Sequence, residues 1–67
     1  MGEVIAVSHI DKQIVLMKAE GMPAKQICDK VSLTEDAVKK RISRLIEKFN
    51  CVSSLHLYKT MKEGGYI

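Results

Sequence analysis

Positive charge is concentrated in one short stretch of this 67-residue chain. Positions 39 to 48 hold five basic residues against a single acid, Glu47, which gives the stretch a formal charge of +4. The rest of the chain holds six bases and seven acids and carries −1, of a total of +3. Lys and Arg neutralise phosphates and donate hydrogen bonds to base edges, so this stretch could bind a nucleic acid. Its basic residues are Lys39, Lys40, Arg41, Arg44 and Lys48.

Helical spacing decides which side of this stretch faces outward. Thr34 is a good N-cap, and Glu35 and Asp36 suit the positive end of a helix dipole, which predicts a helix over 35–49. At 100° per residue, its apolar positions fall within about 60° of arc. They are Val38, Ile42, Leu45 and Phe49. The opposite face carries Asp36, Lys39, Lys40, Ser43, Arg44 and Glu47.

A first helix is predicted over 9–20. Ser8 is a good N-cap, Asp11 stands three residues later as in a capping box, and Gly21 follows as a stop. The apolar stripe is wide enough to suggest burial on more than one side. It comprises Ile10, Ile14, Val15, Leu16 and Met17.

Two further helices complete an all-α, four-helix domain. Pro23 suits a helix first turn, and the apolar spacing after it predicts a short helix over 23–30. Ser53 can cap a last helix that Gly64-Gly65 ends, with Tyr66 and Ile67 available to fold back on it. The apolar face of this last helix comprises Leu57, Tyr58 and Met61.

A short helix joined by a tight turn to a longer basic helix is the pattern of a helix-turn-helix unit. An α-helix fits the major groove of B-DNA, and in such units the N-terminal half of the second helix faces the bases. The helix over 35–49 would then be the recognition helix. Its base-facing residues would be Lys39, Lys40 and Ser43.

The length allows one small domain, which we expect over 8–67. Residues 1–7 form a lead-in that could be a short strand or an arm. Two cysteines make no disulfide framework, and no apolar run reaches the ~20 residues that span a bilayer. These features favour a reduced, cytoplasmic protein with no membrane partner.

Residue types that bind metals or catalyse reactions lack suitable spacing. His9, His56, Cys28 and Cys51 form no C-x-x-C or H-x3-H pattern, so we expect the cysteines to be buried structural thiols. The sequence holds no nucleophile elbow, glycine-rich phosphate loop or supported histidine–carboxylate arrangement. We therefore expect no enzyme, no metal and no cofactor.

Two stretches resemble the LuxR-type helix-turn-helix domain, in one ungapped register over about residues 7–65. The family's opening, Leu-Thr-x-Arg-Glu-x-Glu-Val-Leu-x-Leu-x-Ala-x-Gly, resembles Val7-Ser8-x-x-Asp11-x-Gln13-Ile14-Val15-x-Met17-x-Ala19-x-Gly21. Its middle, Lys-Glu-Ile-Ala-x-x-Leu-x-Ile-Ser-x-x-Thr-Val-Lys, resembles Lys25-Gln26-Ile27-Cys28-Asp29-Lys30-Val31-Ser32-Leu33-Thr34-Glu35-Asp36-Ala37-Val38-Lys39. Leu45, Lys48 and Phe49 stand where the family has Ile-x-x-Lys-Leu.

The resemblance implies the DNA-binding output domain of a bacterial transcription factor, dimeric on a two-fold-symmetric operator. RNA polymerase is a further candidate partner. By position, Lys39, Lys40 and Ser43 would face bases. The positions at which the family meets the phosphate backbone are Lys25, Thr34, Ala37 and Lys48, and we add Arg41 and Arg44 as basic phosphate contacts.

The chain departs from the family pattern at four positions. Ile10 replaces the usual Arg, and Ser54 replaces the Arg that commonly opens the fourth helix. Ala37 replaces a Thr that can bond phosphate, whereas Arg41, in place of the usual His, could add a contact. The resemblance therefore specifies the docking mode better than the individual contacts.

The fourth helix commonly forms the dimer interface in this family. Leu55 lies off its buried face and is the apolar residue most available to a partner, with His56 and Lys59 nearby. Alternatively, Leu55 is one scattered exposed leucine, which is common on protein surfaces.

These features predict a sequence-specific DNA-binding transcriptional regulator. Two alternatives remain from the same residues. One is a small helical adaptor that uses the basic helix on an acidic protein partner. The other is a promoter-contacting domain like that of a sigma factor.

Overall fold

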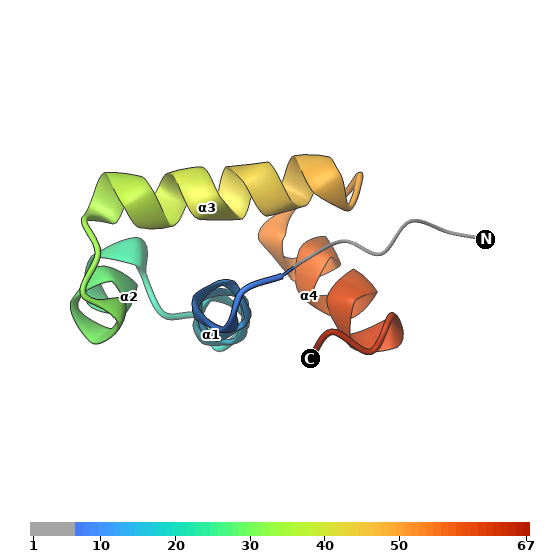
Figure 1. The fold of residues 1–67 in the computed structure, drawn as a ribbon, viewed down its shortest axis with the longest axis horizontal. Helices are drawn as coiled ribbons and strands as arrows, with labels where there is room; N and C mark the ends of the chain where they lie inside the picture. The colour runs from blue at the N-terminus through green and yellow to red at the C-terminus, as the bar shows by residue number, and fades with distance from the viewer. Residues whose placement is uncertain (1–6) are drawn as a thin grey trace.

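The computed structural model describes residues 7–67, which form four α-helices and no strand. The helices are α1 (His9–Ala19), α2 (Ala24–Val31), α3 (Glu35–Lys48) and α4 (Ser54–Glu63). Figure 1 shows α3 lying across the other three, with α2 below one of its ends, α4 below the other, and α1 seen end-on between them. The expected all-α, four-helix class is confirmed. The strand or arm expected at residues 1–7 lies outside the described residues, apart from Val7.

Side-chain caps begin three of these helices, as predicted. Each cap hydroxyl accepts a backbone N–H that the first turn leaves unpaired, at 3.1 to 3.2 Å, and each contributes about 1 kcal/mol. The caps are Ser8 for α1, Thr34 for α3 and Ser53 for α4. The carboxylate half of the expected capping box does not form, because Asp11 instead accepts a hydrogen bond from Arg41 of α3.

The helix ends differ from the predicted ones by one residue. Pro23 has an extended ψ of 154° and is the N-cap of α2, so this helix covers Ala24–Val31 and not 23–30. Helix α3 stops at Lys48, since Phe49 has left helical geometry, and α1 stops at Ala19. The glycine stops behave as expected: Gly21 and Gly65 have φ of +90° and +80°, which a residue with a Cβ rarely adopts.

Two apolar clusters make up the interior of residues 7–67. The first core lies between α1, α2 and the N-terminal half of α3, and consists of Ile14, Ala24, Ile27, Val38 and Ile42. The second core lies between α1, α4 and the C-terminal half of α3, and consists of Val15, Leu45, Leu57 and Met61.

Helix α1 is buried on two sides because its adjacent residues Ile14 and Val15 enter different cores. This confirms the expectation drawn from its wide apolar stripe. Ile10, at the start of α1, was wrongly included in that stripe, since it is 37% exposed, and so was Leu16, which is 38% exposed. Leu16 follows Val15 by another 100° of rotation about the helix axis, so its side chain points past both cores.

The pair α2 and α3 forms the expected helix-turn-helix unit. Residues 32–34 connect the two helices, and Ser32 takes the left-handed conformation with φ of 56°. Ile27 of α2 and Val38 of α3 are fully buried in the same core, which fixes the angle at which α3 is presented. Helix α1 packs against all three other helices, whereas α2 and α4 do not contact each other.

The C-terminal residues fold back on the second core, as predicted. The ring of Tyr66 stands edge-on to that of Phe49, with centroids 5.0 Å apart and an interplanar angle of 87°. Val7 and Ile67 pack against the same core. Both ends of the described chain therefore lie beside α4 and away from α2.

Candidate nucleic-acid interface

The polar face of α3 points to solvent along its whole length. Its core side is closed by Val38, Ile42 and Leu45, each 9% exposed or less. Every residue predicted for the opposite face is exposed: Asp36, Lys39, Lys40, Ser43, Arg44 and Glu47. The apolar periodicity of the sequence therefore predicted correctly which face of α3 is buried and which is exposed.

The residues expected to face bases lie on the exposed part of α3. Lys39 makes an ion pair with Glu35 at 3.5 Å, but both side chains are about half exposed or more, at 62% and 48%. Such an exposed i,i+4 pair contributes about 0.3 to 0.5 kcal/mol and opens readily. Within residues 7–67, Lys40 and Ser43 make no side-chain hydrogen bond or ion pair. Their polar groups are available to a ligand.

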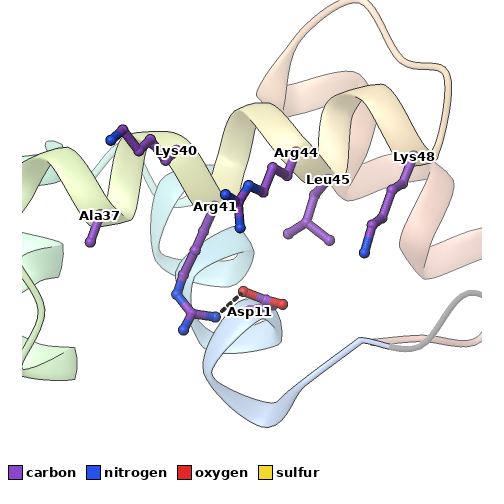
Figure 2. Close-up of a pocket in the computed structure, with 7 residues that line it drawn as sticks. All are labelled: Asp11, Ala37, Lys40, Arg41, Arg44, Leu45 and Lys48. Atoms are coloured by element: carbon purple, nitrogen blue, oxygen red, sulfur yellow. Dashed lines mark hydrogen bonds and ion pairs between the residues drawn. The ribbon is translucent and has the colours of Figure 1, made fainter.

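A hollow of about 290 Å³ lies beside this face, between α3 and the start of α1. Figure 2 shows Arg41, Arg44 and Lys48 extending from α3 toward α1, while Lys40, at the rim, runs along α3 and does not extend toward α1. We call this site the basic hollow. Its lining residues are Asp11, Ala37, Lys40, Arg41, Arg44, Leu45 and Lys48.

The structure brings together part of the predicted phosphate-contacting set. Arg41, Arg44 and Lys48 share the basic hollow. Lys25 is exposed on α2 and does not line it. Thr34 lies at the N-terminus of α3, where its hydroxyl oxygen already accepts the backbone N–H of Ala37 at 3.1 Å.

Asp11, for which the sequence predicted only a capping role, is part of this site. Asp11 Oδ1 accepts a hydrogen bond from Arg41 Nη1 at 3.0 Å, across the hollow from α1 to α3. The side chains are 16% and 38% exposed, so the pair is partly shielded from water. No local pattern reveals a contact between residues 30 positions apart.

The start of α4 presents an apolar surface. Leu55, expected at a dimer interface, is 56% exposed, and His56 and Lys59 are exposed beside it. Val52, which was not among the residues predicted for the dimer interface, is 88% exposed in the turn before α4. The Nδ1 atom of His56 accepts the backbone N–H of Val52 at 3.2 Å and holds this turn against the helix.

The cysteines are half-buried, not buried as expected. Cys28 and Cys51 lie at the edges of the first and second cores, where Cys28 Sγ contacts the carbonyl oxygen of Lys25 at 3.0 Å. No group of three or more His, Cys, Asp or Glu residues within 7–67 could hold a metal ion. Over the same residues, no helix has the length and apolar character needed to cross a membrane.

Comparison with known families gives this geometry a context. The profile of the GerE family, described as bacterial regulatory proteins of the luxR family, matches residues 7–61. The chain belongs to this family. No curated protein and no solved structure gave a significant match.

Membership of the LuxR family makes the chain a DNA-binding domain of a transcription regulator. The match covers all of α1, α2 and α3 and most of α4, so it includes the helix-turn-helix unit and the basic hollow. The departures from the family pattern noted above are spread over this region. Ala37 and Arg41 both line the basic hollow, whereas Ser54 begins α4.

Proposed function

We propose that the chain is a sequence-specific regulator that docks α3 in the major groove of duplex DNA. The observation that carries this proposal is the division of basic side chains on α3. Lys40 runs along α3 at the rim of the basic hollow, while Arg41, Arg44 and Lys48 point into it. One helix thus offers donors toward base edges and a separate group of cations toward a phosphate backbone.

The contacts at the bases are assigned to the exposed face of α3 between positions 39 and 43. Lys can donate to guanine O6 and N7, and a Ser hydroxyl can donate or accept. The base-facing residues that we propose are Lys39, Lys40 and Ser43. Buried Ile27 and Val38 support them from behind, so the side chains approach the groove from a rigid surface.

The contacts to the backbone are assigned to two places. Arg44 and Lys48 would hold one strand from the basic hollow, with Arg41 beside them. Lys25 and the start of α3 at Thr34 would hold the backbone on the α2 side, where helix N-termini attract phosphates. These contacts fix orientation and carry no sequence information.

Two copies would bind through α4. Leu55 and the newly found Val52 provide exposed apolar surface, and His56 and Lys59 surround it. A two-fold dimer places its recognition helices about 34–36 Å apart, one turn of B-DNA, on a palindromic operator. We propose residues 8–67 as the unit that does this, working in the cytoplasm with RNA polymerase as a further partner.

Selection from a random duplex pool, followed by fluorescence anisotropy over a salt series, tests this function. One enriched motif and a steep fall of affinity with salt are expected. Lys48→Ala should make the log–log slope shallower by about 0.9, the value for one lost phosphate. Lys62→Ala, which removes an equal charge at the end of α4, is the matched control and should leave the slope unchanged.

A protein that binds no duplex at 50 mM salt would contradict the proposal. Enrichment of no sequence, together with tight binding to an acidic protein, would favour the adaptor function instead.

A further inference from the structure

One acidic side chain lies among the cations of the basic hollow. Of the residues that line it, Asp11 is the acid, and Lys40, Arg41, Arg44 and Lys48 are the bases. The Asp11 carboxylate lies on α1, on the wall opposite α3 (Figure 2). A phosphate that enters the hollow therefore meets a negative charge as well as the positive ones.

The acid is held against one particular cation. Arg41 Nη1 donates to Asp11 Oδ1 at 3.0 Å, a distance typical of a charge-assisted hydrogen bond, and Asp11 is only 16% exposed. Partly buried pairs are screened by salt less than exposed ones, so salt should weaken this pair less than the exposed Glu35–Lys39 pair of α3. The guanidinium is thereby drawn toward α1.

We propose that Asp11 is a positioning residue that withholds Arg41 from DNA phosphates. In the free protein the carboxylate occupies one edge of the guanidinium, at Nη1, and cancels one charge of the hollow. A phosphate then pairs with Arg44 and Lys48, and reaches Arg41 only by displacing Asp11. This inference rests on the proposed DNA-binding function and changes the role of Arg41 within it.

Replacing the carboxylate by its amide tests this mechanism. Asp11→Asn keeps the size of the side chain and releases Arg41, so DNA binding should tighten. Counted from 1 M salt, one added phosphate contact gives about fifteenfold tighter binding at 50 mM salt and about fourfold at 200 mM salt, with a log–log slope steeper by about 0.9. The gain should be the same on a selected operator and on random duplex, because phosphates carry no sequence information.

Two matched variants separate this effect from others. Asp29→Asn makes the same change of net charge on the exposed surface of α2, outside the hollow, and should shift affinity much less. Asp11→Glu retains the charge and should bind DNA as the wild type does. Equal gains from Asp11→Asn and Asp29→Asn, or weaker binding by folded Asp11→Asn, would overturn the proposal.

Arg41 gives a test that does not depend on the folding of Asp11→Asn. If Asp11 withholds Arg41, Arg41→Gln in the otherwise native chain should change the salt slope by far less than 0.9. A full loss of about 0.9 would show that Arg41 already contacts a phosphate, which contradicts the inference.

Inorganic pyrophosphate distinguishes this inference from the proposed function. Titration monitored by NMR should show tighter pyrophosphate binding to Asp11→Asn than to the wild type, with shifts at Arg44 and Lys48. This result, together with wild-type protein that binds no duplex, would reject the DNA function and support the role of Asp11. Unchanged pyrophosphate affinity in Asp11→Asn would reject that role even if the wild type binds DNA.

Discussion

At the scale of single residues, the direction of a basic side chain on α3 predicts whether it contacts a base or a phosphate of the DNA. Lys40 and Lys48 both belong to α3 and both border the basic hollow, but Lys40 runs along α3 and Lys48 extends into the hollow (Figure 2). The two lysines should therefore differ in what their loss does to DNA binding.

Lys40→Ala should weaken binding to the selected operator by about 1–3 kcal/mol and binding to random duplex much less, because a base contact is sequence-dependent. Anisotropy titrations with both duplexes at one salt concentration measure this difference. Equal losses on the two duplexes would make Lys40 a phosphate contact. Lys62→Ala again serves as the control for the lost charge.

The sequence predicted the exposed residues of the site but not the ion pair across it. Lys40, Ser43 and Arg44 follow from the period of a helix whose apolar side is clear. Asp11 and Arg41 meet only because α1 crosses α3, and a contact over 30 positions depends on packing that periodicity does not contain. The same limit applies to the cysteines, whose half-burial depends on how far each core extends.

At the scale of elements, caps were predictable and exact ends were not. Ser8, Thr34 and Ser53 act as caps because a short hydroxyl side chain can accept a backbone N–H of the first turn. Pro23 is the N-cap of α2, although proline also suits the first helical position, and sequence alone does not choose between these adjacent places.

The turn between α2 and α3 offers a stabilising change. Ser32 has φ of 56° and ψ of 39°, a conformation that costs a residue with a Cβ roughly 1 kcal/mol. Ser32→Gly removes this cost but adds freedom to the unfolded chain, so a net gain of about 0.5 kcal/mol in the free energy of unfolding is expected. Urea denaturation should show a higher midpoint.

Asn50→Gly is the matched comparison for that substitution. Asn50 has φ of 55°, but asparagine adopts the left-handed region more readily than serine, so the gain should be smaller. A lower midpoint for Ser32→Gly than for the wild type would show that the serine side chain stabilises the turn.

At the scale of the whole molecule, α1 couples the two cores. Ile14 and Val15 are adjacent and enter different clusters, so α1 cannot leave one core without disturbing the other. We expect the domain to unfold as one cooperative unit although α2 and α4 do not touch.

Leu57→Ala tests this coupling. Leu57 is fully buried in the second core, and the substitution should cost about 2–5 kcal/mol. Amide hydrogen exchange should become faster in α2 as well as in α4, although α2 contributes nothing to the second core. Faster exchange confined to α4 would mean that the two halves open independently.

The proposed assembly of two copies through α4 can be tested at Leu55. Leu55→Asp should lower the apparent affinity for an operator with two half-sites and leave binding to a single half-site unchanged, because the substitution lies outside α3, the helix proposed to face DNA. Anisotropy with both duplexes, and sedimentation of the complexes, measure this effect. Equal affinity of the variant and the wild type for both operators would leave Leu55 as an isolated exposed leucine.

Val7 and Ile67, at the two ends of the described chain, pack against the same core. A fluorescent label or a surface tether attached at Ile67 would therefore sit close to α4, on the side of the molecule away from α3 (Figure 1). Immobilised in this way, the domain would leave the exposed face of α3, which we propose faces DNA, open to solution. Single-molecule measurements of residence times on DNA are then possible without a linker that crosses α3.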